Sequence, residues 1–328
     1  MPGDCVTIAG RPLPVGDATA FAAAREIDVL IPTRNRPAEL AATLAGLAAQ
    51  DVPEPFGVVI SDQSDGTPQD SVVLSGQPDG ASEDGVVAKD GVVRGDRSDG
   101  AFEDGPSWGH PAAATMVRVL RCAGHRVLLG RHLPRRGLAE HRAFLLSRSR
   151  ARYVLYLDDD VWLEPMAVRV MHQALRELGC GFVGNFPHGL SYADDHRPAQ
   201  QVYEPWLGRP APEWFGPGDP QWRRASLHGA ANLLHLADSL RLPPGQWRAY
   251  KVAWLGACVL FDRAKLVAAG GYDFWDRLPA EHAGEDVVAQ QRVMRWYGGA
   301  GLVPSHAYHL ESPTTVRDRR VQCHEVVR

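Results

Sequence analysis

The sequence predicts an α/β protein in which a mostly parallel central sheet is flanked by helices. Two observations carry this prediction. Short apolar runs, which are typical of buried strands, alternate along the chain with segments whose apolar residues recur at helical spacing. The order strand, helix, strand at these spacings is typical of the parallel βαβ unit. The 328 residues allow one large domain or two domains of ordinary size.

The first βαβ unit lies near the N-terminus. An apolar strand is expected at 27–32, and Pro37 suits the first position of the helix that follows it. Leu40 and Leu44 fall on one face of that helix, and a second apolar strand is expected at 57–62.

The remaining elements continue the alternation. Further strands are expected at 117–121, 153–157, 181–183, 255–261 and 304–310. Further helices are expected at 138–150, 165–178 and 285–296. Gly179 directly follows the second of these helices, which is typical of a helix C-terminus.

Composition divides the chain into segments. We expect one domain at 26–313, with an N-terminal extension at 1–25, an acidic Asp-Gly-rich flexible insertion at 64–111, a Trp/Pro/His-rich region at 187–254 and a C-terminal basic tail or lid at 314–328. The Asp-Gly pairs of the insertion are typical of turns in a flexible segment, and a calcium-binding repeat is the alternative. The region 187–254 has little periodicity, which is typical of a binding region or a lid.

Charge and cysteine content exclude several classes of protein. The net charge is −4, but residues 61–105 carry eleven acidic and three basic side chains, so the rest of the chain is mildly basic. That charge suits an anionic small ligand and is too weak for nucleic acid. The five cysteines are scattered singly, which argues against a disulfide scaffold or a cysteine zinc site.

Because no apolar run reaches the ~18 residues of a membrane helix and no signal peptide is recognisable, we expect a cytoplasmic protein, with peripheral membrane contact left open.

Three adjacent carboxylates, Asp158, Asp159 and Asp160, directly follow the strand expected at 153–157. Ligands of open α/β sheets bind beyond the carboxyl ends of the strands. Three carboxylates there repel one another unless a cation neutralises them, and oxygen ligands favour Mg²⁺ or Mn²⁺. The triplet therefore predicts a divalent-metal site that binds phosphates. A solvated acidic turn that caps the next helix is the alternative.

Two further groups of polar residues are candidates for chemistry. Glu285 and Asp286 begin an expected helix, where they either complement the helix dipole or include a general base that the helix N-terminus keeps ionised. His306 and His309 point to opposite faces of an expected strand, so they do not form a two-histidine zinc clamp. The motifs of Rossmann dehydrogenases, P-loop NTPases, zincins and α/β-hydrolases are absent from the sequence.

Taken in order, these segments resemble family 2 glycosyltransferases of the GT-A fold, a Rossmann-like single domain. The resemblance runs from Ile27 to Pro313 and is interrupted by the acidic insertion. Its blocks are 29–37, 58–64, 137–142, 158–160, 255–258, 270–273, 285–286 and 304–311. The sequence departs from the family at Ala143, where an asparagine is usual.

The resemblance implies a metal-dependent, inverting hexosyltransferase that moves a sugar from a nucleoside-diphosphate sugar to a hydroxyl of a glycan, a lipid carrier or a small molecule. Asp160 and His309 would bind Mn²⁺ or Mg²⁺, and Asp158 or Asp159 would hold the ribose or a metal-bound water. The residues expected to bind the nucleotide base or line its pocket are Asp62, Arg142, Pro32, Thr33, Arg34 and Asn35.

The resemblance also implies the residues of the acceptor side. Asp286 would take the proton from the acceptor hydroxyl, and Glu285 would orient the acceptor or be the base itself. Trp254, Gly256 and Trp275 would contact the acceptor, with packing in the core as the alternative for the two tryptophans. The arginines at 317, 319 and 320 would close over the diphosphate or belong to a solvated tail.

Three alternative interpretations stay open. A phosphohydrolase of the haloacid-dehalogenase type fits the DxDx[TV] pattern at 158–161, although that family carries the motif on its first strand. A sugar nucleotidyltransferase shares the sheet architecture but normally has a Gly-rich, basic N-terminal loop. A non-catalytic nucleotide-sugar-binding relative would share the whole pattern without turnover.

Overall fold

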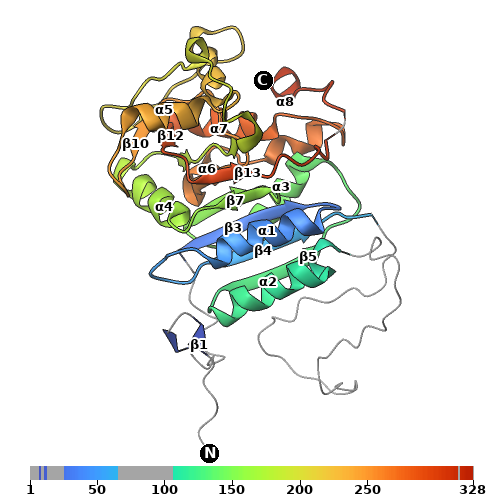
Figure 1. Ribbon diagram of the computed structural model, residues 1–328. Coiled ribbons are helices and arrows are strands. Elements are labelled where there is room, and N and C mark those ends of the chain that lie inside the picture. Colours follow the sequence, from blue (N-terminus) through green and yellow to red (C-terminus); the bar gives the residue numbers. More distant parts are fainter. Residues whose placement is uncertain (1–6, 9–10, 13–25, 66–105, 317, 328) are drawn as a thin grey trace, which may run out of the picture.

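The computed structural model describes residues 7–8, 11–12, 26–65, 106–316 and 318–327. Eight of the described strands form one sheet in the order β10-β12-β8-β11-β6-β3-β4-β5 (Figure 1). They are β3 (Ile27–Thr33), β4 (Gly57–Asp62), β5 (Arg126–Arg131), β6 (Tyr153–Leu157), β8 (Phe182–Gly184), β10 (Arg248–Tyr250), β11 (Cys258–Asp262) and β12 (Gly299–Val303). The pairs β12–β8, β6–β3, β3–β4 and β4–β5 are parallel, and the other three are antiparallel. The predicted α/β fold with a mostly parallel sheet is confirmed.

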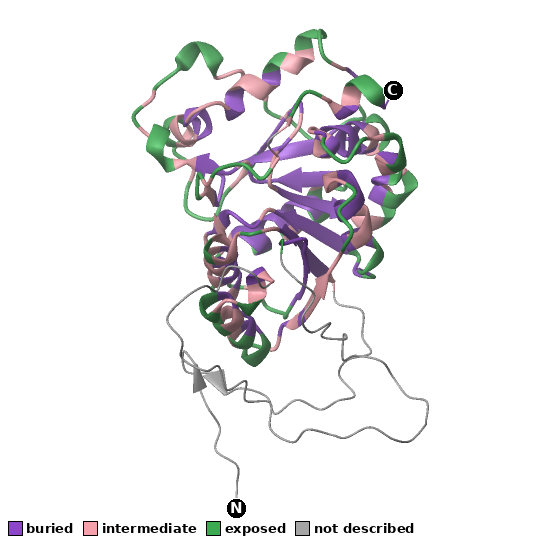
Figure 2. Ribbon diagram, turned by 90° about the vertical axis from the view of Figure 1, so that its right-hand side faces the viewer, coloured by how far each residue is buried: buried purple, intermediate pink, exposed green. Residues whose placement is uncertain are grey.

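Helices cover both faces of this sheet. One face is covered by α1 (Pro37–Ala48), α2 (Pro111–Cys122) and α4 (Ala167–Leu178). The other is covered by α3 (Leu138–Ser147), α6 (Arg263–Ala268) and α7 (Glu285–Tyr297). Figure 2 shows the central strands buried between these helices, which carry exposed residues on their outer sides.

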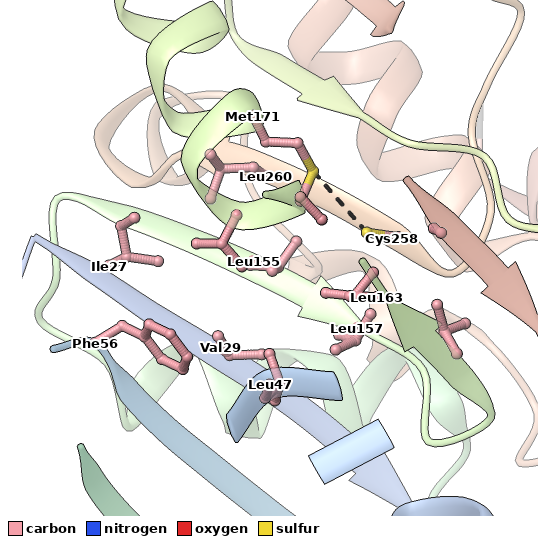
Figure 3. Close-up of a cluster of buried hydrophobic side chains, with 14 of the residues drawn as sticks. Ile27, Val29, Leu47, Phe56, Leu155, Leu157, Leu163, Met171, Cys258 and Leu260 are labelled. Atoms are coloured by element: carbon pink, nitrogen blue, oxygen red, sulfur yellow. Dashed lines mark hydrogen bonds between the residues drawn. The ribbon is translucent and has the colours of Figure 1, made fainter. Parts of the chain in front are cut away.

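Two apolar clusters form because successive side chains of a strand point to opposite faces. Val29 of β3 and Leu155 of β6 pack in the cluster that contains α1, α2 and α4, which Figure 3 shows in close-up. Leu30 and Val154, their neighbours in sequence, pack in the cluster on the other face. The central strands are therefore apolar on both faces, as is usual for parallel strands between two helical layers.

A second, small sheet brings the late part of the chain to the middle of the molecule. Its order is β7 (Val161–Leu163), β13 (Ala307–His309) and β9 (His188–Gly189), with β13 in the centre. In the antiparallel register His309 lies opposite Val161. Gly46 of α1 allows this sheet to lie close, since a Cβ atom there would lie 2.9 Å from the backbone nitrogen of Leu163.

The region between β9 and β10 is built from short helical segments. They are η3 (Leu190–Tyr192), η4 (Pro198–Gln200), η5 (Pro220–His228) and α5 (Asn232–Leu240). The other described elements are η2 (Ser107–Gly109), η6 (Asp273–Arg277), α8 (Cys323–Val326) and the paired strands β1 (Thr7–Ile8) and β2 (Arg11–Pro12). Cys323 of α8 is buried against the core. In the described part of the chain, no helix has the length and apolar character needed to cross a membrane.

One sequence-based prediction of an element is wrong, and one central strand was not predicted. The strand expected at 117–121 is part of α2, whose buried Ala113, Val117 and Leu120 recur at helical spacing, and the strand itself follows as β5. The strand β12 was not predicted, because Gly299 and Gly301 disfavour a strand.

The predicted extension at 1–25 and insertion at 64–111 fall mostly outside the described residues, which include only 7–8 and 11–12 of the first and 64–65 and 106–111 of the second. The described ends of the insertion meet. Ser64 Oγ lies 3.0 Å from Ser107 Oγ, so the chain returns beside the point where it leaves β4.

Candidate active site

Three parallel strands end in polar residues at one edge of the sheet. Thr33 ends β3, Asp62 ends β4, and Asp158 directly follows β6. Because β3, β4 and β6 are mutually parallel, these residues lie at the same edge, where ligands of open α/β sheets bind. Most of the sequence-predicted site residues belong to this edge or contact it.

Asp159 and Asp160 are buried and share one arginine. Arg36 Nη1 donates to Asp159 Oδ1 at 3.1 Å and to Asp160 Oδ2 at 2.7 Å. Thr33 Oγ1 donates to the second oxygen of Asp159 at 2.7 Å. Thr43 of α1 fixes the backbone of the triplet, because its hydroxyl donates to the Asp159 carbonyl at 2.8 Å and accepts from the next strand.

Asp158 is joined to the start of α7 by a buried arginine. Arg142 Nη2 donates to Asp158 Oδ1 and Arg142 Nε donates to Glu285 Oε1, both at 2.9 Å. Only 4 % of the Arg142 side chain is exposed, and the carbonyl of this residue accepts from the Tyr156 hydroxyl. The aspartate triplet and the acidic pair, more than a hundred residues apart in sequence, therefore form one cluster.

His309 lies beside Asp160, as the register of the small sheet requires. Its Nε2 is 3.6 Å from Asp160 Oδ2, and the Leu310 amide donates to the Asp160 carbonyl. Its Nδ1 accepts the Glu311 amide at 2.7 Å, so the ring proton of neutral His309 is on Nε2. His306 has a different partner, since its Nδ1 is 2.7 Å from Glu164 Oε2.

The cluster carries more negative than positive charge. Among the described residues it contains the carboxylates of Asp158, Asp159, Asp160, Glu285 and Asp286 and the guanidinium groups of Arg36 and Arg142. Burial, which the contacts with Thr33 and Arg36 only partly offset, raises the pKa of Asp159 to about 7. Burial and the neighbouring Glu285 raise the pKa of Asp286 to about 7, and burial together with Asp158 raises the pKa of Asp160. A bound cation would relieve this excess of negative charge.

The donor set fits a divalent cation in part. Asp160 is a buried carboxylate of the kind that Mg²⁺ and Mn²⁺ prefer. His309 fits through Nε2 once its proton moves to Nδ1, which requires loss of the Glu311 contact. In the described residues, no group of three or more His, Cys, Asp or Glu side chains is already arranged around a common point for a metal. Arg36 lies against the oxygen that faces His309.

The residues expected to form the base pocket surround the end of β4. Asp62 is fully buried, and its two oxygens accept the backbone amides of Ser64 and Ser107. Arg34 and Asn35 are more exposed and both contact the carboxylate of Asp65. Asn35 holds a left-handed backbone conformation, with φ of 54°.

Two further residues expected to bind the base or line its pocket are Pro32 and Arg142. Pro32 is buried within β3, opposite Ser61 of β4. Arg142 has Asp158 and Glu285 as its ion-pair partners, whereas Asp62 is bound by backbone amides. Arg142 therefore joins the two halves of the acidic cluster.

The acceptor-side candidates are only partly buried. Trp254 and Gly256 lie next to one another on the segment before β11, which Gln290 of α7 holds by bonds to both backbone groups of Leu255. The Ala257 carbonyl of this segment accepts the Asp158 amide at 2.8 Å. Trp275, on η6, has the Arg136 guanidinium 5.9 Å from its ring centre. Trp254 and Gly256 are thus tied to the acidic cluster through the backbone.

The sequence did not predict that Arg36 and Thr43 contact the aspartate triplet. Both lie in or beside the first helix, more than a hundred residues before the aspartates that they contact. A signal for Arg36 was present, since it is a basic residue immediately after a strand that ends at the predicted site.

A cavity of about 630 Å³ lies at the opposite edge of the sheet, lined by Ile27, Phe56 and His172 among others. None of the predicted site residues lines it. The carboxylate cluster and this cavity are therefore separate features.

Comparisons with known proteins find similarity only among solved structures. No family model matches the sequence, and no curated protein matches it. Residues 1–349 of S. aureus TarS are 14 % identical with a TM-score of 0.47, over 87 % of this chain and 60 % of that one. The same TarS fragment in complex with UDP-GlcNAc is 13 % identical with a TM-score of 0.48, over 89 % and 60 % of the two chains. The mannosyltransferase PcManGT from Pyrobaculum calidifontis, in complex with GDP-Man and Mn²⁺, is 14 % identical with a TM-score of 0.42, over 85 % and 57 %. The chain thus spans about 60 % of the length of these structures.

Proposed function

We propose that this chain is a metal-dependent, inverting glycosyltransferase that moves a sugar from a nucleoside-diphosphate sugar to an acceptor hydroxyl. The observation that carries the proposal is the bridge from Asp158 through Arg142 to Glu285. It joins the carboxyl end of a parallel strand, where a phosphate-bearing ligand would bind, to a second acidic pair that can serve as a base. The resemblance to family 2 glycosyltransferases assigns these two groups to donor and acceptor.

Asp160 and His309 are the residues that would hold Mn²⁺ or Mg²⁺, with Mn²⁺ favoured by the mixture of oxygen and imidazole nitrogen. When bound, the ion would neutralise charge that develops on the leaving nucleoside diphosphate. The chain itself would contribute Thr33, which orients the Asp159 carboxylate, and the exposed Arg34–Asn35 turn beside the nucleotide. Trp254 and Trp275 remain candidates for contact with the acceptor.

Asp286 is the better candidate for the base, and Glu285 the better candidate for orientation. Glu285 is buried, and its carboxylate already accepts from Arg142, so a fixed contact holds this side chain in place. Asp286 is partly exposed and accepts only the Val287 amide among the described hydrogen bonds. A carboxylate with a pKa of about 7 combines an ionised population at neutral pH with the ability to accept a proton.

The first experiment is a thermal-shift screen of UDP-, GDP- and dTDP-sugars, each with and without MnCl₂. A ligand that binds only the folded state stabilises it by RT ln(1 + [L]/Kd) and so raises the melting temperature, and the true donor should stand out. Turnover is then measured as release of the nucleoside diphosphate in the presence of candidate acceptors. Binding of no nucleotide sugar would contradict the proposal, release of inorganic phosphate alone would support a phosphohydrolase, and binding without turnover would support a non-catalytic relative.

A further inference from the structure

Arg36 connects three separate parts of the chain at the proposed donor site. It precedes α1, and its Nη1 atom donates to Asp159 and Asp160. Its Nη2 atom donates to the carbonyl of Pro313, near the other end of the chain. The side chain is 11 % exposed, so these contacts form in a largely buried environment.

The position of Arg36 is the one where a divalent cation would act. Asp160 Oδ2 lies 2.7 Å from Arg36 Nη1 and 3.6 Å from His309 Nε2, so one oxygen faces both groups. An ion held by Asp160 and His309 would lie close to the guanidinium, and two cations in a poorly solvated site repel each other strongly. The ion and the present Arg36 contact therefore exclude one another.

Residues 310–313 cross the site and are fastened on the same side. The Leu310 amide donates to the Asp160 carbonyl, and the Ser312 hydroxyl donates to Glu39 of α1 at 3.0 Å. Arg36 holds the far end of this segment through Pro313. If Arg36 moved away from the aspartates, its contact with the Pro313 carbonyl, and thus the position of residues 310–313, would also change.

We propose that Arg36 is an internal counter-cation that competes with the divalent ion for Asp160, so that the ion binds tightly only together with a nucleoside diphosphate. The inference rests on the proposed function, because the diphosphate is what offers Arg36 a new anionic partner. Guanidinium groups bind phosphate oxygens in a bidentate manner, which matches the two donors that Arg36 uses here. By linkage, the metal then strengthens nucleotide binding by the same factor.

The test is titration of MnCl₂ into the metal-free protein, followed by electron paramagnetic resonance of free Mn²⁺, with and without saturating UDP or GDP. In the unchanged protein we expect the nucleotide to tighten Mn²⁺ binding by about 10-fold or more, within the usual range of coupling between sites. Arg36→Gln removes the charge and keeps a hydrogen-bond donor. It should bind Mn²⁺ alone about 10-fold more tightly and lose most of the effect of the nucleotide.

Two further variants serve as controls. Arg36→Lys keeps the positive charge, so it should bind Mn²⁺ alone as weakly as the unchanged protein, but it should gain less from the nucleotide because an ammonium group cannot bind phosphate in a bidentate manner. Arg169→Met removes another arginine that pairs with an aspartate, Asp51, far from the site, and should leave Mn²⁺ affinity unchanged. Arg36→Gln should tighten Mn²⁺ binding much less when it is added to Asp160→Asn than when it is added to the unchanged protein, which assigns the competition to Asp160.

The Mn²⁺-only arm separates this inference from the proposed function. If no nucleotide binds but Arg36→Gln still tightens Mn²⁺, the proposed function fails and the competition stands. If nucleotides bind and Arg36→Gln binds Mn²⁺ no better than the unchanged protein, or neither protein binds Mn²⁺, the inference is wrong. Should Arg36→Gln unfold at working temperature, its melting temperature must rise more with MnCl₂ than that of the unchanged protein, and an equal rise overturns the inference.

Discussion

At the scale of single residues, Asp286 carries the most specific prediction. The Asp286→Asn variant keeps the size and the Val287 contact of the side chain but cannot accept a proton as a base. We expect turnover to fall about 10²–10⁴-fold, as is usual for loss of a general base, while nucleotide affinity changes little. Turnover and nucleotide binding are measured on the same preparation.

The matched control for Asp286 is Asp51→Asn, which changes an exposed aspartate that pairs with Arg169 away from the candidate site. It should keep full turnover. Equal activity of Asp286→Asn and the unchanged protein would remove Asp286 from the mechanism and return Glu285 as the candidate base.

The raised pKa of Asp286 gives a second prediction, on the pH dependence of the rate. The carboxyl group must be ionised to act as a base, so turnover should fall as the pH drops below about 7, where this group takes up a proton. A pH profile of kcat at saturating donor measures this directly. A rate that stays constant from neutral pH down to the usual range of exposed carboxyl groups would contradict the assignment.

At the scale of elements, the approach of α1 to β7 positions the aspartate triplet. Thr43 of α1 holds the Asp159 carbonyl, and Gly46, one turn later, lies against the backbone of Leu163. In an ordinary helix Gly→Ala stabilises by about 1 kcal/mol. Here the added Cβ would lie 2.9 Å from a backbone atom that cannot move aside, and such overpacking costs about 1–3 kcal/mol.

We therefore expect Gly46→Ala to lower the free energy of unfolding by about 1 kcal/mol net and to weaken nucleotide binding. Urea denaturation measures the first effect, and thermal shift with the nucleotide measures the second. The variant Ala42→Gly, in the same helix, measures the difference in helix propensity between alanine and glycine without the contact with β7. A Gly46→Ala variant that is more stable than the unchanged protein would show that the contact between α1 and β7 is not tight.

Residues 117–121, predicted as a strand, belong to the helix α2 because of residues that precede them. Residues 117–119 alternate apolar and basic side chains, which is typical of a strand over so short a span. The preceding Ala113 extends the helical spacing through Val117 to Leu120, and Pro111 begins the helix. The strand β12 was not predicted for another reason. Its glycines leave room for the rings of Phe182 and Tyr250, a constraint from tertiary packing that no local pattern carries.

At the scale of the whole molecule, the grouping of the candidate residues at one edge of the sheet was predictable and their contacts were not. Parallel strands present their carboxyl ends at one edge, so the grouping of Thr33, Asp62 and the aspartates follows from the order of elements. The partners of Arg36 and Arg142 depend on side-chain positions that join distant segments. Spacing in sequence does not determine them, and they decide how the charge of the acidic cluster is compensated.

The contact between Ser64 and Ser107 has a consequence for how this gene product can be engineered. The two anchors of residues 66–105 are adjacent, so a four-residue Gly/Ser bridge should replace the intervening forty without disturbing β4 or α2. Shortening a connection by about tenfold lowers its closure cost by about 2 kcal/mol, so the truncated protein should unfold at an equal or higher temperature. Calorimetry on the full-length and shortened proteins measures the unfolding temperature, and the nucleotide screen on both measures binding. Loss of cooperative unfolding would mean that the folded structure requires residues 66–105.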